Sequence, residues 1–110
     1  MNGMRRRLLL ATGAAALVSA HTLRAQAAPA THTVTIDAFE FKPATLSVKQ
    51  GDAVVWRNAD PVPHSATAEG TFDSGPLATG ASWRYTATKK GRFDYICTLH
   101  PTMKATLIVE

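Results

Sequence analysis

The sequence contains one cysteine, Cys97, among its 110 residues. A single thiol excludes an intrachain disulfide framework, and it also excludes the zinc sites that are built from paired or fourfold cysteines. Helical spacing of apolar residues is absent as well. The cysteine therefore needs an explanation of its own.

An excess of charge is also missing from most of the chain. Of the twelve Lys and Arg, four lie in the first 27 residues, so residues 28–110 carry eight cations against eight anions. Nucleic-acid binders usually show a concentrated basic face, and attachment to anionic lipid needs clustered cations. The sequence therefore argues against a nucleic-acid partner and against a lipid surface.

No hydrophobic run is long enough to cross a bilayer, because the longest, residues 8–20, stops short of the roughly 20 residues required. It follows Arg5–Arg7 and precedes the small residues of Ala25-Gln26-Ala27, which is the pattern of a secretory signal. We expect residues 1–27 to be a cleaved signal peptide and residues 28–110 to be one periplasmic domain without a permanent membrane anchor. The arginines also match a twin-arginine signal, and the sequence leaves the two export routes open.

From residue 33 onward, apolar residues alternate at a period of two and turn residues separate the runs. This pattern predicts an all-β fold, a small Greek-key β-sandwich or barrel of about six to eight strands. Residues 69–81 contain three glycines and one proline, so we expect an irregular loop there, with Phe72 and Leu77 as its buried plugs. His32 has no partner motif and is expected to be solvated.

The informative stretch places Cys97, His100 and Met103 three residues apart, at the end of a predicted strand. Pro101 cannot sit inside a paired strand, so the chain should form a loop here. His64 follows another strand, and a sandwich could bring it to this loop. A thiolate, two imidazoles and a thioether suit copper better than zinc, which rarely uses Met, or hard cations, which prefer oxygen.

These residues closely resemble the cupredoxins, the blue copper proteins, and within them the amicyanin group; pseudoazurins and plastocyanins are similar more loosely. The motif that carries the resemblance is Cys97-Thr98-Leu99-His100-Pro101-Thr102-Met103. The resemblance implies one copper ion, held by His64, Cys97, His100 and Met103. It also implies a supporting role for Asn58, which we expect to tie the His64 segment to the Cys97 loop. Leu99 stands where the amicyanin group has proline.

The predicted function is a non-enzymatic one-electron carrier between redox proteins, such as a periplasmic dehydrogenase and a c-type cytochrome. We expect a monomer that docks through a small apolar patch around Pro63, Leu99 and Pro101. A copper-delivery or storage module is the alternative, but such proteins often carry extra Met or His. A Cys-His hydrolase would explain neither Met103 nor the short spacing. The sequence does not identify the donor, the acceptor or the redox potential.

Overall fold

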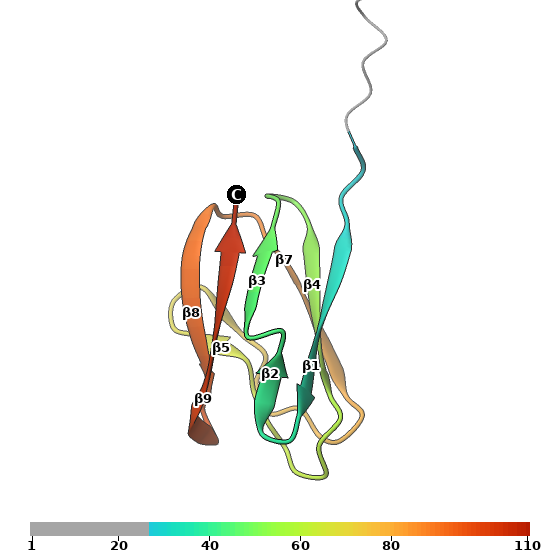
Figure 1. The fold of residues 1–110 in the computed structure, drawn as a ribbon, viewed down its shortest axis with the longest axis vertical. Helices are drawn as coiled ribbons and strands as arrows, with labels where there is room; N and C mark the ends of the chain where they lie inside the picture. Colours follow the sequence, from blue (N-terminus) through green and yellow to red (C-terminus); the bar gives the residue numbers. More distant parts are fainter. Residues whose placement is uncertain (1–26) are drawn as a thin grey trace, which may run out of the picture.

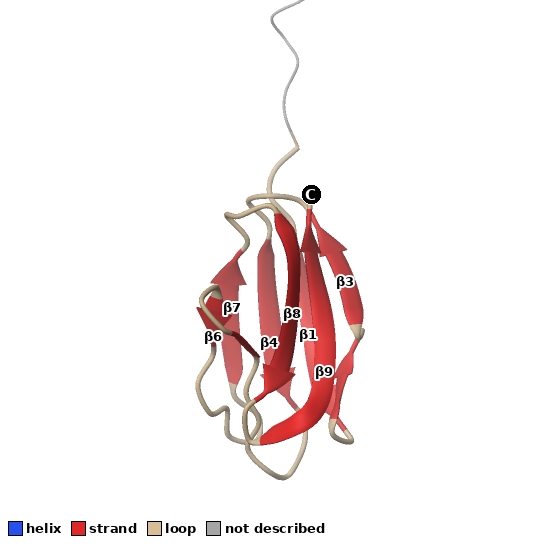
Figure 2. Ribbon diagram, turned by 90° about the vertical axis from the view of Figure 1, so that its left-hand side faces the viewer, coloured by secondary structure: helices blue, strands red, loops and turns tan. Residues whose placement is uncertain are grey.

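The structure, a computed structural model, describes residues 27–110, and these residues form nine strands and no helix. Two sheets pack face to face as a sandwich (Figures 1 and 2). The first sheet has the order β2-β1-β4-β7 and the second has the order β3-β9-β8-β5-β6. In chain order the strands are β1 Thr31–Asp37, β2 Glu40–Lys42, β3 Thr45–Val48, β4 Ala53–Asn58, β5 Thr67–Ala68, β6 Phe72–Asp73, β7 Ser82–Thr86, β8 Gly91–Cys97 and β9 His100–Val109.

Alternation along β1 and β4 builds one wall of the core. Val34 and Ile36 of β1 are fully buried, and so are Val54 and Trp56 of β4. The two strands pair in parallel, with Val34 opposite Trp56, so the inward residues of both lie on the same face. Burying one such side chain stabilises the fold by about 1.5–3 kcal/mol. This face ends on a buried amide, that of Asn58.

The opposite wall comes from β8 and β9, where Tyr95, Cys97, Leu107 and Val109 are buried. The Tyr95 ring bridges the two sheets, since its centroid lies 4.8 Å from Phe41 and 5.5 Å from Trp56. Burial raises the pKa of Tyr95 to about 12, so the phenol stays neutral. An aromatic core therefore lies directly behind Cys97.

The predicted all-β sandwich is confirmed, but the described residues contain more strands than the six to eight expected. The additional pairing includes β5 and β6, which are two residues long each. Strands of that length show no measurable alternation, so periodicity could not reveal them. Phe72 and Leu77 are both 6% exposed and plug the core, as predicted.

Three turns meet at one end of the sandwich, opposite the C-terminus (Figure 1): the turn between β1 and β2, the segment after β4, and the turn between β8 and β9. The candidate site lies at this end. No helix in the described part of the chain is long and apolar enough to cross a membrane. The predicted signal peptide lies outside the described residues, apart from its last residue.

Candidate metal centre

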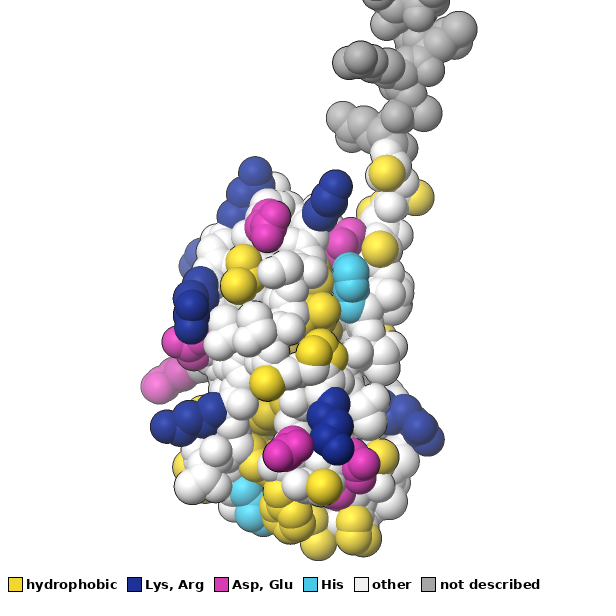
Figure 3. Space-filling model, in the orientation of Figure 1, with side chains coloured by type: hydrophobic (Ala, Val, Ile, Leu, Met, Phe, Trp, Pro, Cys, Tyr) yellow, Lys and Arg dark blue, Asp and Glu magenta, His cyan; other side chains and the backbone are white. Residues whose placement is uncertain are grey.

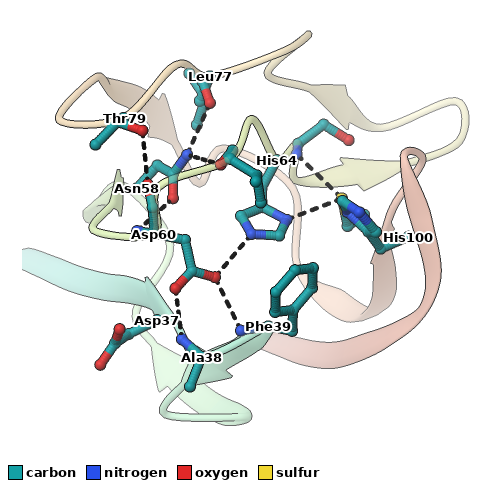
Figure 4. Close-up of polar contacts among 12 residues, drawn as sticks. Asp37, Ala38, Phe39, Asn58, Asp60, His64, Leu77, Thr79 and His100 are labelled. Atoms are coloured by element: carbon teal, nitrogen blue, oxygen red, sulfur yellow. Dashed lines mark hydrogen bonds and ion pairs between the residues drawn. The ribbon is translucent and has the colours of Figure 1, made fainter.

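His64, Cys97 and His100 converge at this end, with one potential ligand atom from each within 4.8 Å of the others. The Cys97 sulfur lies 3.6 Å from Nδ1 of His64 and 3.8 Å from Nδ1 of His100. Figure 4 shows the His64 and His100 rings turned toward each other, and their centroids are 4.9 Å apart. His64 and Cys97 are fully buried, whereas His100 is partly exposed.

These separations match three ligands of a single metal ion. Nitrogen and sulfur ligands lie about 2.0–2.3 Å from an ion such as zinc, so three of them in one plane are about 3.5–4.0 Å apart. Both sulfur-to-nitrogen distances fall in that range. The two sulfur-to-nitrogen separations therefore suit coordination of one ion by all three side chains.

The turn between β8 and β9 places two of these donors. Cys97 pairs with His100 across a two-residue turn, and the next paired residues are Ile96 and Lys104. Residues 101–103 therefore bulge out of the β8–β9 ladder. This bulge accommodates Pro101, which has no amide hydrogen to donate. Met103 follows in the same bulge and is 5% exposed, as an inward-pointing side chain should be.

His64 is held from two sides. Its backbone forms two hydrogen bonds with Leu77, at 3.1 and 2.7 Å. Its ring Nε2 donates to Asp60 at 2.8 Å, which leaves Nδ1 directed at the Cys97 sulfur (Figure 4). Ligating histidines in metal sites are commonly oriented by a carboxylate in this way.

Asp60 was missed by the sequence reasoning, although it is 3% exposed and lies four residues before His64. Its carboxylate also accepts the amide hydrogens of Phe39, at 2.9 Å, and Ala38, at 2.7 Å. The Phe39 amide contributes most to lowering the pKa of Asp60, with help from Ala38 and His64 and against the effect of burial. The signal available in the sequence was a carboxylate four residues before a candidate ligand, but its backbone partners lie in the distant turn between β1 and β2.

Asn58 stabilises the His64 segment through different partners from those expected. Its amide donates to the carbonyls of Val62 and Leu77, and its oxygen accepts the amide hydrogen of Asp60, all at 2.9 Å. The bonds to the Cys97 loop come instead from Ser65. Its amide donates to the Cys97 sulfur at 3.3 Å, and its hydroxyl accepts the Thr98 amide hydrogen at 3.0 Å.

The surface around His100 is apolar. Leu99 and Phe39 are each 48% exposed, and Pro63 and Pro101 are also exposed. Figure 3 shows hydrophobic side chains gathered beside histidine at this end of the molecule, with charged side chains at the edge of the patch. Phe39, which the sequence reasoning did not include, lies edge-on against both histidine rings.

Fold and donor set together define the class, and the chain belongs to the cupredoxin-like family, whose domain model matches residues 8–109. Amicyanin-alpha of Methylorubrum extorquens is 35% identical over 114 aligned positions, covering 93% of this chain and 92% of the relative. The solved structure of an oxidised amicyanin variant has a TM-score of 0.68 at 29% identity, over 73% of this chain and 82% of that chain. A copper-containing nitrite reductase from Thermus scotoductus has a TM-score of 0.69 at 28% identity, over 78% of this chain but 23% of the reductase.

The predicted resemblance to cupredoxins of the amicyanin type is confirmed by these relatives. The predicted copper cofactor is likewise confirmed by the family and the donor set, because a thiolate with two imidazoles at trigonal spacing is the set that copper electron-transfer sites use.

Proposed function

We propose that the protein is a blue copper electron carrier that holds one copper ion through His64, Cys97, His100 and Met103. The observation that carries the proposal is the spacing of the Cys97 sulfur and the two Nδ1 atoms at the apolar end of a sandwich. The bound copper would supply one-electron chemistry by cycling between Cu(II) and Cu(I). Met103, which is buried in the same bulge, would be a weak fourth ligand.

The chain's contribution is to keep the ligands fixed during that cycle. His64 is held by Leu77 and Asp60, and the Cys97 sulfur accepts a hydrogen bond from the Ser65 amide. Ligands that move little between the two oxidation states allow fast electron exchange. Full burial of His64 and Cys97 shields the proposed copper position from solvent, which suits a carrier that passes electrons through a protein contact.

His100 would be the exit point for the electron, because it is the partly exposed member of the donor set. The patch of Pro63, Leu99 and Pro101 surrounds it and would dock the redox partner. Transient electron-transfer complexes bury less than about 1,200 Å² in total, so a small apolar patch would be sufficient for docking. The chain would act as a monomer in the periplasm, between a donor such as a dehydrogenase and an acceptor such as a c-type cytochrome.

A visible spectrum and a redox titration of the copper-loaded protein test this function. An electron carrier is expected to show an intense thiolate-to-copper band in the oxidised state and to lose and regain it through repeated reduction and oxidation, without releasing copper. A protein that binds copper but releases it on reduction would instead be a delivery or storage module. Absence of the band in a copper-loaded sample would contradict coordination by Cys97.

A further inference from the structure

The turn between β1 and β2 has an unusual backbone for its sequence. Asp37 pairs with Glu40, so Ala38 and Phe39 form a two-residue turn, and their φ angles are 51° and 59°. Hairpin turns with two positive φ angles strongly prefer Asn-Gly or Asp-Gly. A bulky residue such as phenylalanine is an outlier in this region. Strained residues of this kind cluster at functional sites.

The Asp60 carboxylate holds this strained turn in place. Its two oxygens accept the amide hydrogens of Ala38 and Phe39, and one of these oxygens also accepts the ring hydrogen of His64 (Figure 4). One buried carboxylate therefore fixes both a candidate ligand and the backbone that carries Phe39.

The ring of Phe39 lies against the two histidines. Its centroid is 5.1 Å from that of His64 at an interplanar angle of 88°, and 4.9 Å from that of His100 at 89°. Such edge-to-face pairs are favourable beyond the area that they bury. Phe39 is nevertheless 48% exposed, so core burial alone does not explain why a phenylalanine occupies this turn.

His100 needs a restraint that His64 does not. Among the described residues, the one polar contact of the His100 ring is the Cys97 sulfur at 3.8 Å, whereas His64 also has Asp60. His100 also sits at a two-residue turn and is partly exposed. In the part of the chain that the structure describes, the His100 ring lacks a carboxylate partner of this kind, and the Phe39 ring packs against it instead.

We propose that Phe39 is a positioning residue that restrains the His100 ring, so that Nδ1 stays directed at the metal position beside Cys97. The inference rests on the proposed copper site but not on electron transfer. Asp60 maintains this restraint by holding the turn, which couples the buried histidine to the exposed one.

Phe39→Gly is the test variant, because glycine adopts positive φ readily and retains the amide that Asp60 accepts. Ala38→Gly is the matched control, since it relaxes the same turn and keeps the ring. Phe39→Tyr is the rescue, since it restores an aromatic ring. A substitution that loosened only the turn would affect both glycine variants alike.

The first measurement is the side-chain rotamer averaging of His100 in the copper-free protein, from three-bond NMR couplings, which the ring current of Phe39 does not disturb. The second is copper release from the reduced protein to a coloured Cu(I) chelator, which does not depend on the protein's own colour. We expect more rotamer averaging and about two- to tenfold faster release in Phe39→Gly, the fold-change that one aromatic pair corresponds to. Ala38→Gly and Phe39→Tyr should match the wild type.

Wild-type couplings and release in Phe39→Gly would overturn the inference, and so would equal changes in both glycine variants. Failure of the proposed function has a different signature, namely a wild-type protein that shows no thiolate-to-copper band. The couplings in the copper-free protein test the inference in that case as well.

Discussion

Two histidine–aspartate pairs lie at opposite ends of the sandwich and are built alike. At the site end, Asp60 accepts the His64 ring hydrogen and two backbone amides. At the end near the C-terminus, Asp52 lies 2.9 Å from His32 Nε2 and accepts the backbone amides of Ala30 and Lys49. In each pair one carboxylate connects a histidine to backbone from a different part of the chain.

The pairs differ in what surrounds the histidine. The His64 side chain is fully buried and its second nitrogen faces the Cys97 sulfur, whereas the His32 side chain is 28% exposed and lines an open groove of about 400 Å³ with Glu110. A histidine–aspartate pair is therefore not a metal site in itself. It becomes part of one where a sulfur donor lies opposite the free nitrogen.

Removing the Cys97 sulfur should remove what distinguishes the His64–Asp60 pair from the His32–Asp52 pair, namely its place in a copper site. We expect Cys97→Ser to lose the thiolate-to-copper band completely and most of its copper affinity, because a serine hydroxyl is a poor ligand for Cu(I). Visible spectroscopy and copper titration measure both effects. Because the sequence contains one cysteine, retention of the band would show that the band does not arise from a thiolate, and Cys97 would not be a ligand.

Exchanging the two carboxylates for amides separates their roles. In Asp60→Asn one of the two acceptor oxygens becomes an NH₂ and the negative charge is lost, so the His64 ring is held less firmly than by the carboxylate. We expect a 10- to 100-fold loss of copper affinity, of the order seen when partners of metal ligands are changed. Asp52→Asn is the matched control and should leave copper affinity unchanged.

Both variants should also unfold more easily, since each leaves backbone donors unsatisfied. Chemical denaturation measures this loss of folding stability in each variant, and the measured copper affinities are corrected for it. Equal losses of copper affinity in the two variants would show that Asp60 acts only through overall stability.

A charge on the apolar patch should slow electron exchange without altering the metal. Electron self-exchange between the oxidised and the reduced protein requires the apolar patches of two molecules to meet. Leu99→Lys would therefore bring two positive charges together and remove water from both. We expect a several-fold slower rate by NMR line broadening, less so at high salt, with an unchanged visible spectrum. Ser47→Lys, at an exposed position lining the far-end groove, is the control and should exchange at the wild-type rate.

Local patterns were enough to predict the longer strands and the candidate donors. Val54, Trp56 and Asn58 alternate onto one face, and Cys97, His100 and Met103 lie close together in the sequence around one turn. The supporting groups were not predictable in the same way. Asp60 acts on Ala38 and Phe39 from a segment more than twenty residues away, and these contacts exist only after β1 and β4 have paired.

Two sequence expectations failed for the same reason. Asn58 is expected to tie the His64 segment to the Cys97 loop. It does bond to the residues before His64, but the donor to the Cys97 sulfur is Ser65, directly after His64. His32 was expected to be solvated and is instead paired with Asp52. In each case the residue type was informative about its need for a partner, and only the tertiary arrangement identifies the partner.

The His32–Asp52 pair should affect the free energy of unfolding at acid pH and not the copper affinity. Hydrogen bonds from His32 and then from the amides of Ala30 and Lys49 lower the pKa of Asp52 from 3.8 to about 2. A carboxyl whose pKa is lower in the folded state stabilises the fold above its unfolded pKa, and that contribution disappears as the pH falls through the folded value. The free energy of unfolding of the wild type should therefore exceed that of Asp52→Asn by a constant amount above about pH 4, and the difference should shrink between there and about pH 2. Denaturant titrations at a series of pH values measure it, and a difference that stays constant down to pH 2 would contradict an ionised Asp52 as the partner of His32, Ala30 and Lys49.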